Sequence, residues 1–259
     1  MTTFPRHDEQ QIREAVVALA DRFDTGEAHL DQWAIQYGTG HIAHYASLID
    51  NVRQLVESNG FSRVLEVGSA PGHIPVILRR AGLNVEVVDI FPERAKRLYE
   101  EYDIPFHKVD VEQQDLPYRD GELEMVVFSE VIEHLRINPM HAVREIFRVL
   151  KPGGMCLLST PQITPLMRWR FLFGVDYQDD VVAEYEKVER LGHMGHIRLY
   201  SEREVRHLVE HVGFSLERVN TGGKPAGVPG DRMANFLRWR FPEGMRTQIY
   251  VWLRKPETS

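Results

Sequence analysis

The sequence predicts an α/β protein in which a mostly parallel sheet lies between layers of helices. From Arg63 onward, short apolar runs alternate with helical stretches, and this alternation is typical of βαβ units. The chain has 259 residues, of which 43% are apolar, so it can bury a complete core. No linker or low-complexity tract divides the part after residue 60. We therefore expect one α/β domain over residues 61–259.

The first sixty residues are predicted to form an N-terminal helical cap, residues 1–60. Apolar side chains recur there at spacings of three and four, which indicates amphipathic helices. One stripe comprises Ile12, Val16, Leu19 and Phe23, and a second comprises Ile42, Tyr45, Leu48, Val52 and Leu55. Asn59-Gly60 is then a good helix stop. Helices that precede the first strand must pack over the core or cover a cleft.

The sheet domain is predicted to contain seven strands. Five of them fall at 63–67, 84–89, 105–109, 125–129 and 154–159, with helices between them at 72–81, 92–102 and 140–150. A less regular insertion follows at residues 161–198. Ser201 and Glu204 form a capping box that begins another helix, and Gly213 ends it. Two closing strands are expected at 215–219 and 248–254.

Composition narrows the class of protein. Lysine and arginine total 31 against 38 acidic residues, a net charge of −7, which argues against a broad nucleic-acid surface. The single cysteine, Cys156, excludes a disulfide framework and is expected to be buried. No apolar run approaches the length of a membrane span, so a cytoplasmic protein is expected. Nothing in the sequence indicates an oligomeric state.

The first predicted strand runs into a glycine-containing turn, Gly68-Ser69-Ala70-Pro71-Gly72, before a helix. Glycines at such a turn let the backbone approach a ligand at the positive end of the helix. The dinucleotide fingerprint needs glycine at the first, third and sixth places of the turn. Those places hold Gly68, Ala70 and His73, so a dinucleotide is not favoured. The Gly-Lys-Ser/Thr ending of a phosphate loop is also absent.

Acidic residues end three consecutive strands. Glu66 stands two residues before the first glycine of the turn, which favours a ligand with a cationic amino-acid part. Asp89 ends the second strand 23 residues later, where a carboxylate can accept both hydroxyls of a ribose. Asp110 ends the third strand and could face an adenine amine. Since these positions share one edge of the sheet, the three acids should converge on one crevice.

In this set of motifs, residues 60–220 resemble the class I S-adenosylmethionine-dependent methyltransferases. Glu66-x-Gly68-x-Ala70-x-Gly72 looks like their first motif, with alanine in place of the middle glycine. The resemblance implies S-adenosylmethionine as cofactor, bound by Glu66, Gly68, Ala70, Gly72, Asp89, Ile90, Asp110, Val111 and Ser129. It also implies a single Rossmann-like seven-stranded sheet whose last strand is antiparallel, with an insertion after strand five.

The fourth strand ends in a group of ionisable residues, Glu130, Glu133 and His134. If a helical turn begins at Glu130, these side chains share one face and could bind a divalent metal such as Mg²⁺. His196 is the best further ligand, with His193 next. The pattern resembles two branches of the family, the small-RNA 3′-terminal 2′-O-methyltransferases and the ubiquinone-pathway O-methyltransferases. Two alternatives stay open: His134 or His196 as a metal-free general base, or no base at all.

The acceptor pocket is expected between the cap and the insertion. Tyr37, His41, His44 and Tyr45 could line it from the cap. Trp169, Phe171, Phe173 and Tyr177 give the insertion an apolar character that suggests a lid over an apolar or aromatic acceptor.

The leading functional hypothesis is methylation of a small-molecule acceptor, with oxygen as the acceptor atom. A metal-dependent RNA 2′-O-methyltransferase is the first alternative. Residues 168–171, Arg-Trp-Arg-Phe, recur at 238–241, and arginine between aromatic residues can stack bases, although the acidic net charge opposes this partner. A non-catalytic cofactor-binding module is the second alternative.

Overall fold

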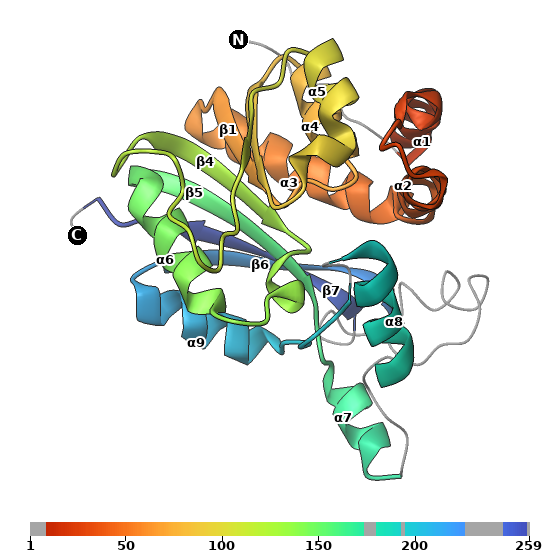
Figure 1. The fold of residues 1–259 in the computed structure, drawn as a ribbon. Helices are drawn as coiled ribbons and strands as arrows, with labels where there is room; N and C mark the ends of the chain where they lie inside the picture. Colours follow the sequence, from red (N-terminus) through yellow and green to blue (C-terminus); the bar gives the residue numbers. More distant parts are fainter. Residues whose placement is uncertain (1–8, 174–179, 193–194, 226–245, 258–259) are drawn as a thin grey trace.

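The computed structural model describes residues 9–173, 180–192, 195–225 and 246–257. Its centre is a seven-stranded sheet in the order β3-β2-β1-β4-β5-β7-β6 (Figure 1). The strands are β1 (Arg63–Val67), β2 (Asn84–Asp89), β3 (Phe106–Lys108), β4 (Leu123–Ser129), β5 (Leu150–Pro161), β6 (Ser215–Pro225) and β7 (Arg246–Arg254). Strand β7 lies between β5 and β6 and runs antiparallel to both. The predicted fold class is therefore confirmed.

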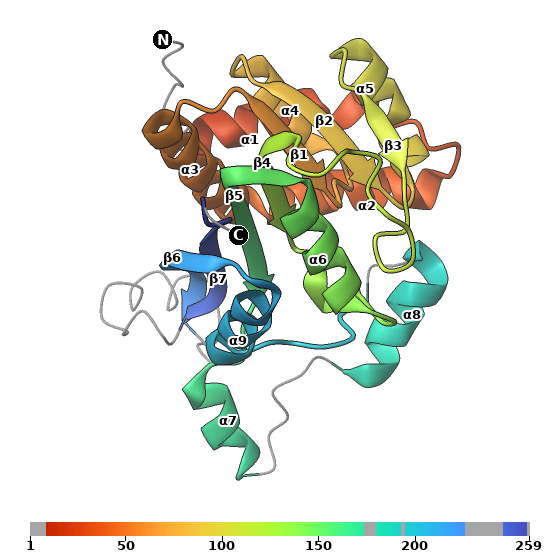
Figure 2. The ribbon, with the colours of Figure 1, turned by 90° about the vertical axis from the view of Figure 1, so that its left-hand side faces the viewer.

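Helices cover both faces of the sheet (Figures 1 and 2). They are α1 (Glu9–Ala18), α2 (Ala28–Gly40), α3 (Ile42–Asn59), α4 (His73–Arg80), α5 (Lys96–Glu101), α6 (Pro139–Val149), α7 (Pro165–Phe171), α8 (Val181–Leu191) and α9 (Glu202–Val212), with 3₁₀ turns η1 (Ala20–Arg22), η2 (Pro92–Ala95) and η3 (Ile132–His134). Helices α6 and α9 bury one face of the sheet, and α1, α3 and α4 bury the other.

The cap differs from the sequence prediction in two respects. The first apolar stripe does not lie on one helix, because α1 ends at Ala18 and Phe23 follows in an extended conformation. Helix α2 was not predicted at all. It contains Gly38 and Gly40, which disfavour a helix, but it is stabilised by burial of Leu30 and Ala34 against the rest of the protein.

The boundaries of the sheet domain follow the sequence closely. Strands β1 and β2 match their predicted limits, whereas β5 is longer because it pairs with a strand on each side. The stretch predicted as a helix at 92–102 begins as the 3₁₀ turn η2. The capping box of Ser201 and Glu204 is present, and Cys156 is buried. Among the described helices, none is both long and apolar enough to cross a membrane.

Candidate active site

A cavity of about 660 Å³ lies at the carboxyl ends of β1, β2 and β4. The strand order reverses between β1 and β4, and this switch point is where open α/β sheets bind ligands. The cap contributes side chains from α2 and α3, and the insertion contributes the end of α8. The volume falls within the range typical of ligand sites.

The turn after β1 requires glycine at two of its positions. Gly68 has a φ of 75°, and a Cβ there would lie 2.2 Å from Cγ2 of Val131. Gly72 has a φ of 98°, and its Cβ would lie 2.8 Å from that of Ala95. Ala70, at the place of the family's middle glycine, has no such positive φ. The turn therefore tolerates alanine at this one place while its two glycines keep the backbone close to the cavity.

Asp89 holds this turn in place from the end of β2. Its Oδ2 accepts hydrogen bonds from the backbone N–H of Ser69 at 2.8 Å and of Ala70 at 3.2 Å. Its Oδ1 accepts one from the N–H of Phe91 at 2.8 Å. Asp89 and Ile90, which were predicted to bind the cofactor, both line the cavity.

Glu66 is almost completely buried and has an unsatisfied oxygen. Its side chain is 3% exposed, and Oε2 has no hydrogen-bond partner. Burial raises the pKa of Glu66 well above its usual value, and the nearby charge of Asp89 adds to the effect. A cationic group in the cavity would satisfy this carboxylate. The residue therefore fits the ammonium group of the implied cofactor.

The segment after β3 forms the next part of the wall. Asp110 and Val111 line the cavity, and the Asp110 carboxylate accepts hydrogen bonds from the N–H of Glu112 at 3.0 Å and from Nε2 of Gln113 at 2.6 Å. Glu112 in turn accepts three backbone N–H groups from residues 136–138, at 2.6–2.9 Å. The segment predicted to contact adenine is thus fastened to the loop that follows η3.

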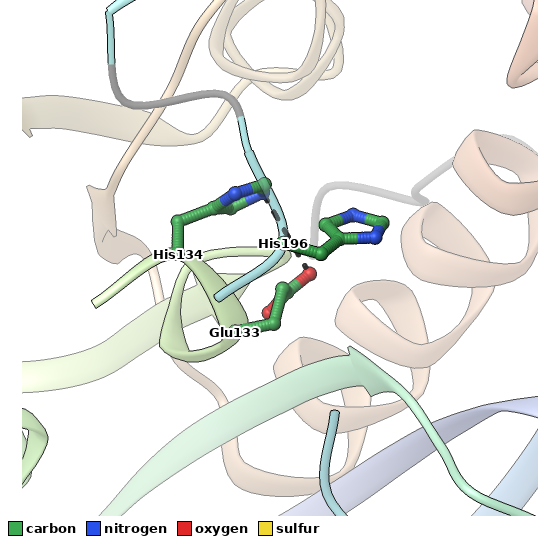
Figure 3. A group of neighbouring side chains, drawn as sticks. All are labelled: Glu133, His134 and His196. Atoms are coloured by element: carbon green, nitrogen blue, oxygen red, sulfur yellow. Dashed lines mark ion pairs between the residues drawn. The ribbon is translucent and has the colours of Figure 1, made fainter. Parts of the chain in front are cut away.

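A second group of cavity-lining side chains comprises Glu133, His134 and His196 (Figure 3). One ligand atom from each lies within 4.8 Å of the others. His134 Nε2 is 3.9 Å from Glu133 Oε1, the contact dashed in Figure 3, and the His134 and His196 rings are 5.0 Å apart. Oε1 of Glu133 has no hydrogen-bond partner, although the residue is fully buried. These donors form a group suited to a metal ion.

The protonation states at this group follow from burial. Burial is the main reason that the pKa of Glu133 is well above its usual value, with a further contribution from Glu130. Burial also lowers the pKa of His134 to about 4. Nδ1 of His134 is 2.9 Å from the carbonyl oxygen of Gly195, so a neutral ring that donates there presents Nε2 to the group.

Glu130 does not share a helical face with Glu133 and His134. Its φ is 55°, and the 3₁₀ turn begins only at Ile132. Oε1 of Glu130 instead accepts hydrogen bonds from Ser159 Oγ at 2.9 Å and from Gln248 Nε2 at 2.5 Å. The prediction that Glu130, Glu133 and His134 share one face of a helical turn is therefore wrong, although Glu130 still lines the cavity.

A chain of polar contacts connects Glu130 to the cap. Ser159 Oγ is 2.7 Å from Ser129 Oγ, which is 3.4 Å from His44 Nε2. His44 Nδ1 is 2.9 Å from the hydroxyl of Tyr250. Burial lowers the pKa of His44, which favours its neutral form. No sequence pattern indicated Ser159, Tyr250 or Gln248, because these residues reach the site through the pairing of β5 with β7.

The cap residues singled out in the sequence all line the cavity: Tyr37, His41, His44 and Tyr45. His73, which was not singled out as a site residue, lines it too and is 1% exposed. Its Nδ1 is 3.4 Å from the hydroxyl of Tyr45, and burial lowers its pKa to about 4.

The end of α8 is a part of the insertion that lines the cavity, whereas Trp169 and Phe173, which were singled out in the sequence, do not. Trp169 and Phe173 are 57% and 68% exposed and lie outside the cavity wall. Lys187, Arg190 and Leu191 at the end of α8 line it instead. Tyr177, His193 and the repeat at 238–241 lie outside the described residues, as does the side chain of Phe171.

Two hydrogen bonds fix the end of α8, which lines the cavity. Arg94 Nη1 donates to the carbonyl oxygen of Leu191 at 2.8 Å, and His29 Nε2 is 3.2 Å from that of Arg190. Cationic groups are favourable at the carbonyl end of a helix. Core and cap therefore both contact the insertion.

Comparison with known proteins identifies the family of the chain. A family model described as a methyltransferase domain matches residues 40–219. A ubiquinone biosynthesis O-methyltransferase from Xanthomonas oryzae is 32% identical over 122 residues, 45% of this chain and 50% of that protein. A probable S-adenosylmethionine-dependent methyltransferase from Mycolicibacterium smegmatis is 37% identical over 106 residues, 38% of this chain and 37% of that protein. The matches thus span half or less of these relatives.

Solved structures share the fold. An S-adenosylmethionine-dependent methyltransferase from Archaeoglobus fulgidus has a TM-score of 0.57 at 14% identity, over 82% of this chain and 92% of that one. The N-methyltransferase NodS from Bradyrhizobium japonicum, in complex with S-adenosylhomocysteine, has a TM-score of 0.53 at 14% identity, over 83% and 86%. The chain therefore belongs to the family of S-adenosylmethionine-dependent methyltransferases that share this methyltransferase domain and its Rossmann-like fold.

Proposed function

We propose that this protein transfers the methyl group of S-adenosylmethionine to an oxygen atom of a small-molecule acceptor. The observation that carries the proposal is that one cavity contains both the cofactor turn with its acids and the group of Glu133, His134 and His196. The partial match to an O-methyltransferase supports oxygen as the acceptor atom. The cofactor supplies an activated methyl group, so the protein has to position the acceptor and take up its proton.

The cofactor would lie along the carboxyl edge of β1, β2 and β3. Glu66 would pair with its ammonium group and Asp89 with its ribose, while Asp110 and Val111 would face its adenine. Further contacts would come from Gly68, Ala70, Gly72, Ile90 and Ser129, all of which line the cavity except Gly72. The unsatisfied oxygen of Glu66 supports this orientation, because a buried carboxylate needs a partner of opposite charge.

Glu133, His134 and His196 would hold a divalent metal such as Mg²⁺. A metal would supply a positive charge that gathers acceptor hydroxyls and lowers their pKa. The contact of His134 Nδ1 with Gly195 supports this role, because ligand histidines are oriented by a second hydrogen bond. Two imidazoles also suit a first-row transition metal. If no metal binds, His134 or His196 is the residue that would accept the acceptor proton.

The cofactor is tested by thermal unfolding with S-adenosylhomocysteine. Saturating ligand should raise the melting temperature, and Asp89→Asn should abolish the rise because the amide cannot accept the same N–H groups. Asp103→Asn is the matched control, since Asp103 has a 95% exposed side chain outside the cavity. An unmodified protein that shows no rise would remove the cofactor assignment.

The metal is tested with Mn²⁺ alone, followed by electron paramagnetic resonance. We expect saturable binding that Glu133→Gln abolishes. Glu130→Gln shows whether Glu130 is a fourth ligand. If this variant still binds Mn²⁺, Glu130 is not a ligand, and if it loses Mn²⁺ binding, Glu130 belongs to the site. Absence of binding in the unmodified protein would leave the two metal-free alternatives, a histidine base or no base at all.

A further inference from the structure

Three aromatic side chains form a continuous row on the cavity side of α2. Trp33, Tyr37 and His41 are spaced by four residues, so they lie along one face of the helix, and all three line the cavity. The Trp33 and Tyr37 rings are 5.3 Å apart and tilted by 43°. The Tyr37 and His41 rings are 3.9 Å apart and nearly parallel, at 16°. We call this row the aromatic wall.

The aromatic wall leads from the cofactor region to the acidic side of the cavity. Trp33 also borders a small hollow together with Asp89 and Phe91, and the proposed function assigns the ribose of the cofactor to Asp89. Tyr37 lies within electrostatic reach of Glu130 and Glu133: burial chiefly raises the pKa of Tyr37, and the charges of these two acids raise it further. A molecule next to the cofactor and beside Glu133 would therefore contact the wall.

The wall is held in position by the backbone of α2. Nδ1 of His41 donates to the carbonyl oxygen of Tyr37 at 2.7 Å, which fixes the His41 ring in its stacked arrangement. Gly38 faces α4, where a Cβ would lie 2.5 Å from Cε1 of His73. Only glycine allows α2 to approach α4 so closely. This close approach fixes the position of α2, and with it the aromatic wall, relative to α4.

We infer that Tyr37 and His41 select an acceptor with a planar aromatic ring, which binds between the aromatic wall and Glu133. This inference rests on the proposed function, because it assigns the acceptor class to the same cavity. Aromatic rings attract one another in offset-stacked or edge-to-face arrangements, beyond the effect of the area that they bury. A ring hydroxyl would then face the group of Glu133, His134 and His196, which is the polar side of the cavity.

The test compares catechol with trans-cyclohexane-1,2-diol, which has the same pair of hydroxyls on a saturated ring. Ligand-observed NMR titrations are run with EDTA, so that metal chelation does not contribute, and with and without S-adenosylhomocysteine. We expect catechol to bind about three- to tenfold more tightly than the diol, as expected for an aromatic pair. Tyr37→Leu should remove this preference, and Tyr37→Phe should retain it.

Gln36→Ala is the matched control on the same helix, because Gln36 is exposed and lies outside the cavity wall. Equal affinities for catechol and diol in the unmodified protein, which need no variant, would overturn the inference. A preference that survives in a folded Tyr37→Leu protein would overturn it as well. Failure of S-adenosylhomocysteine to bind would instead overturn the proposed function, while the ligand-free titrations would still decide the role of the wall.

Discussion

Glu66→Gln tests the orientation of the cofactor most directly. Glutamine keeps the size of the side chain but removes the charge that would pair with the ammonium group of the cofactor. A hydrogen bond to a charged group contributes about 1.5–3 kcal/mol, which corresponds to an affinity loss of about 12- to 160-fold. Glu66 is only 3% exposed, so solvent screens this interaction little, and the loss should fall in the upper half of that range.

The same substitution should have the opposite effect on the ligand-free protein. Because the pKa of Glu66 is raised on folding, the unfolded chain releases its proton at lower pH than the folded protein does. Stability should therefore fall as pH rises from the usual glutamate value through the raised one. Glu66→Gln removes this fall, so its melting temperature without ligand should match that of the unmodified protein below pH 4 and exceed it at pH 8.

Isothermal titration with two ligands provides the assay. S-adenosylhomocysteine carries the amino-acid part, whereas 5′-methylthioadenosine lacks it, so only the first should bind Glu66→Gln more weakly. An affinity for S-adenosylhomocysteine within about twofold of the unmodified protein would refute the pairing. An equal loss for both ligands would show that the substitution disturbs the whole turn rather than one contact.

Three further predictions concern the turn, its support and the nucleic-acid alternative. Gly60→Ala should lower the free energy of unfolding by about 1–2 kcal/mol, because its φ is positive and nothing lies near its Cβ. Gly68→Ala should lower it by about 1 kcal/mol more in chemical denaturation, because its Cβ would also overlap Val131. Equal losses for the two variants would contradict this. Glu112→Gln should destabilise the protein by about 1–3 kcal/mol, since glutamine retains only one of the two oxygens that accept from residues 136–138, and unchanged stability would show that the loop is held elsewhere. A short single-stranded RNA should show no salt-dependent affinity in fluorescence anisotropy, given the net charge of −7, and an affinity that falls steeply with salt would favour the RNA alternative.

The proposed cofactor half of the site could be outlined from the sequence because its signals are local. Glycine at positions 68 and 72 is required by backbone conformation and by close neighbours, so the motif carries its own physical reason. Glu66 and Asp89 end adjacent parallel strands, and β1 and β2 match their predicted limits, which places both acids at one edge. Strand ends in a parallel sheet can be located without knowledge of the rest of the fold.

The acceptor half could not be predicted to the same extent, because it depends on contacts between distant segments. No local sequence signal predicts helix α2, because its glycines disfavour a helix. The reason for Gly38 is the close packing of α2 against α4, which the sequence does not show. The positive φ of Glu130 separates it from Glu133, although sequence spacing would place both on one helical face. His196 was found from residue type alone, and its approach to His134 requires the folded insertion.

The place of β7 has a consequence for the order in which the protein acquires its site during synthesis. β7 pairs with β5 and with β6, and it delivers Gln248 to Glu130 and Tyr250 to His44. These contacts join residues 118 and 206 positions apart, so the ribosome must have made the sequence through residue 250 before both can form. A nascent chain can complete the turn after β1 early, but Glu130 and His44 lack these contacts until β7 joins the sheet.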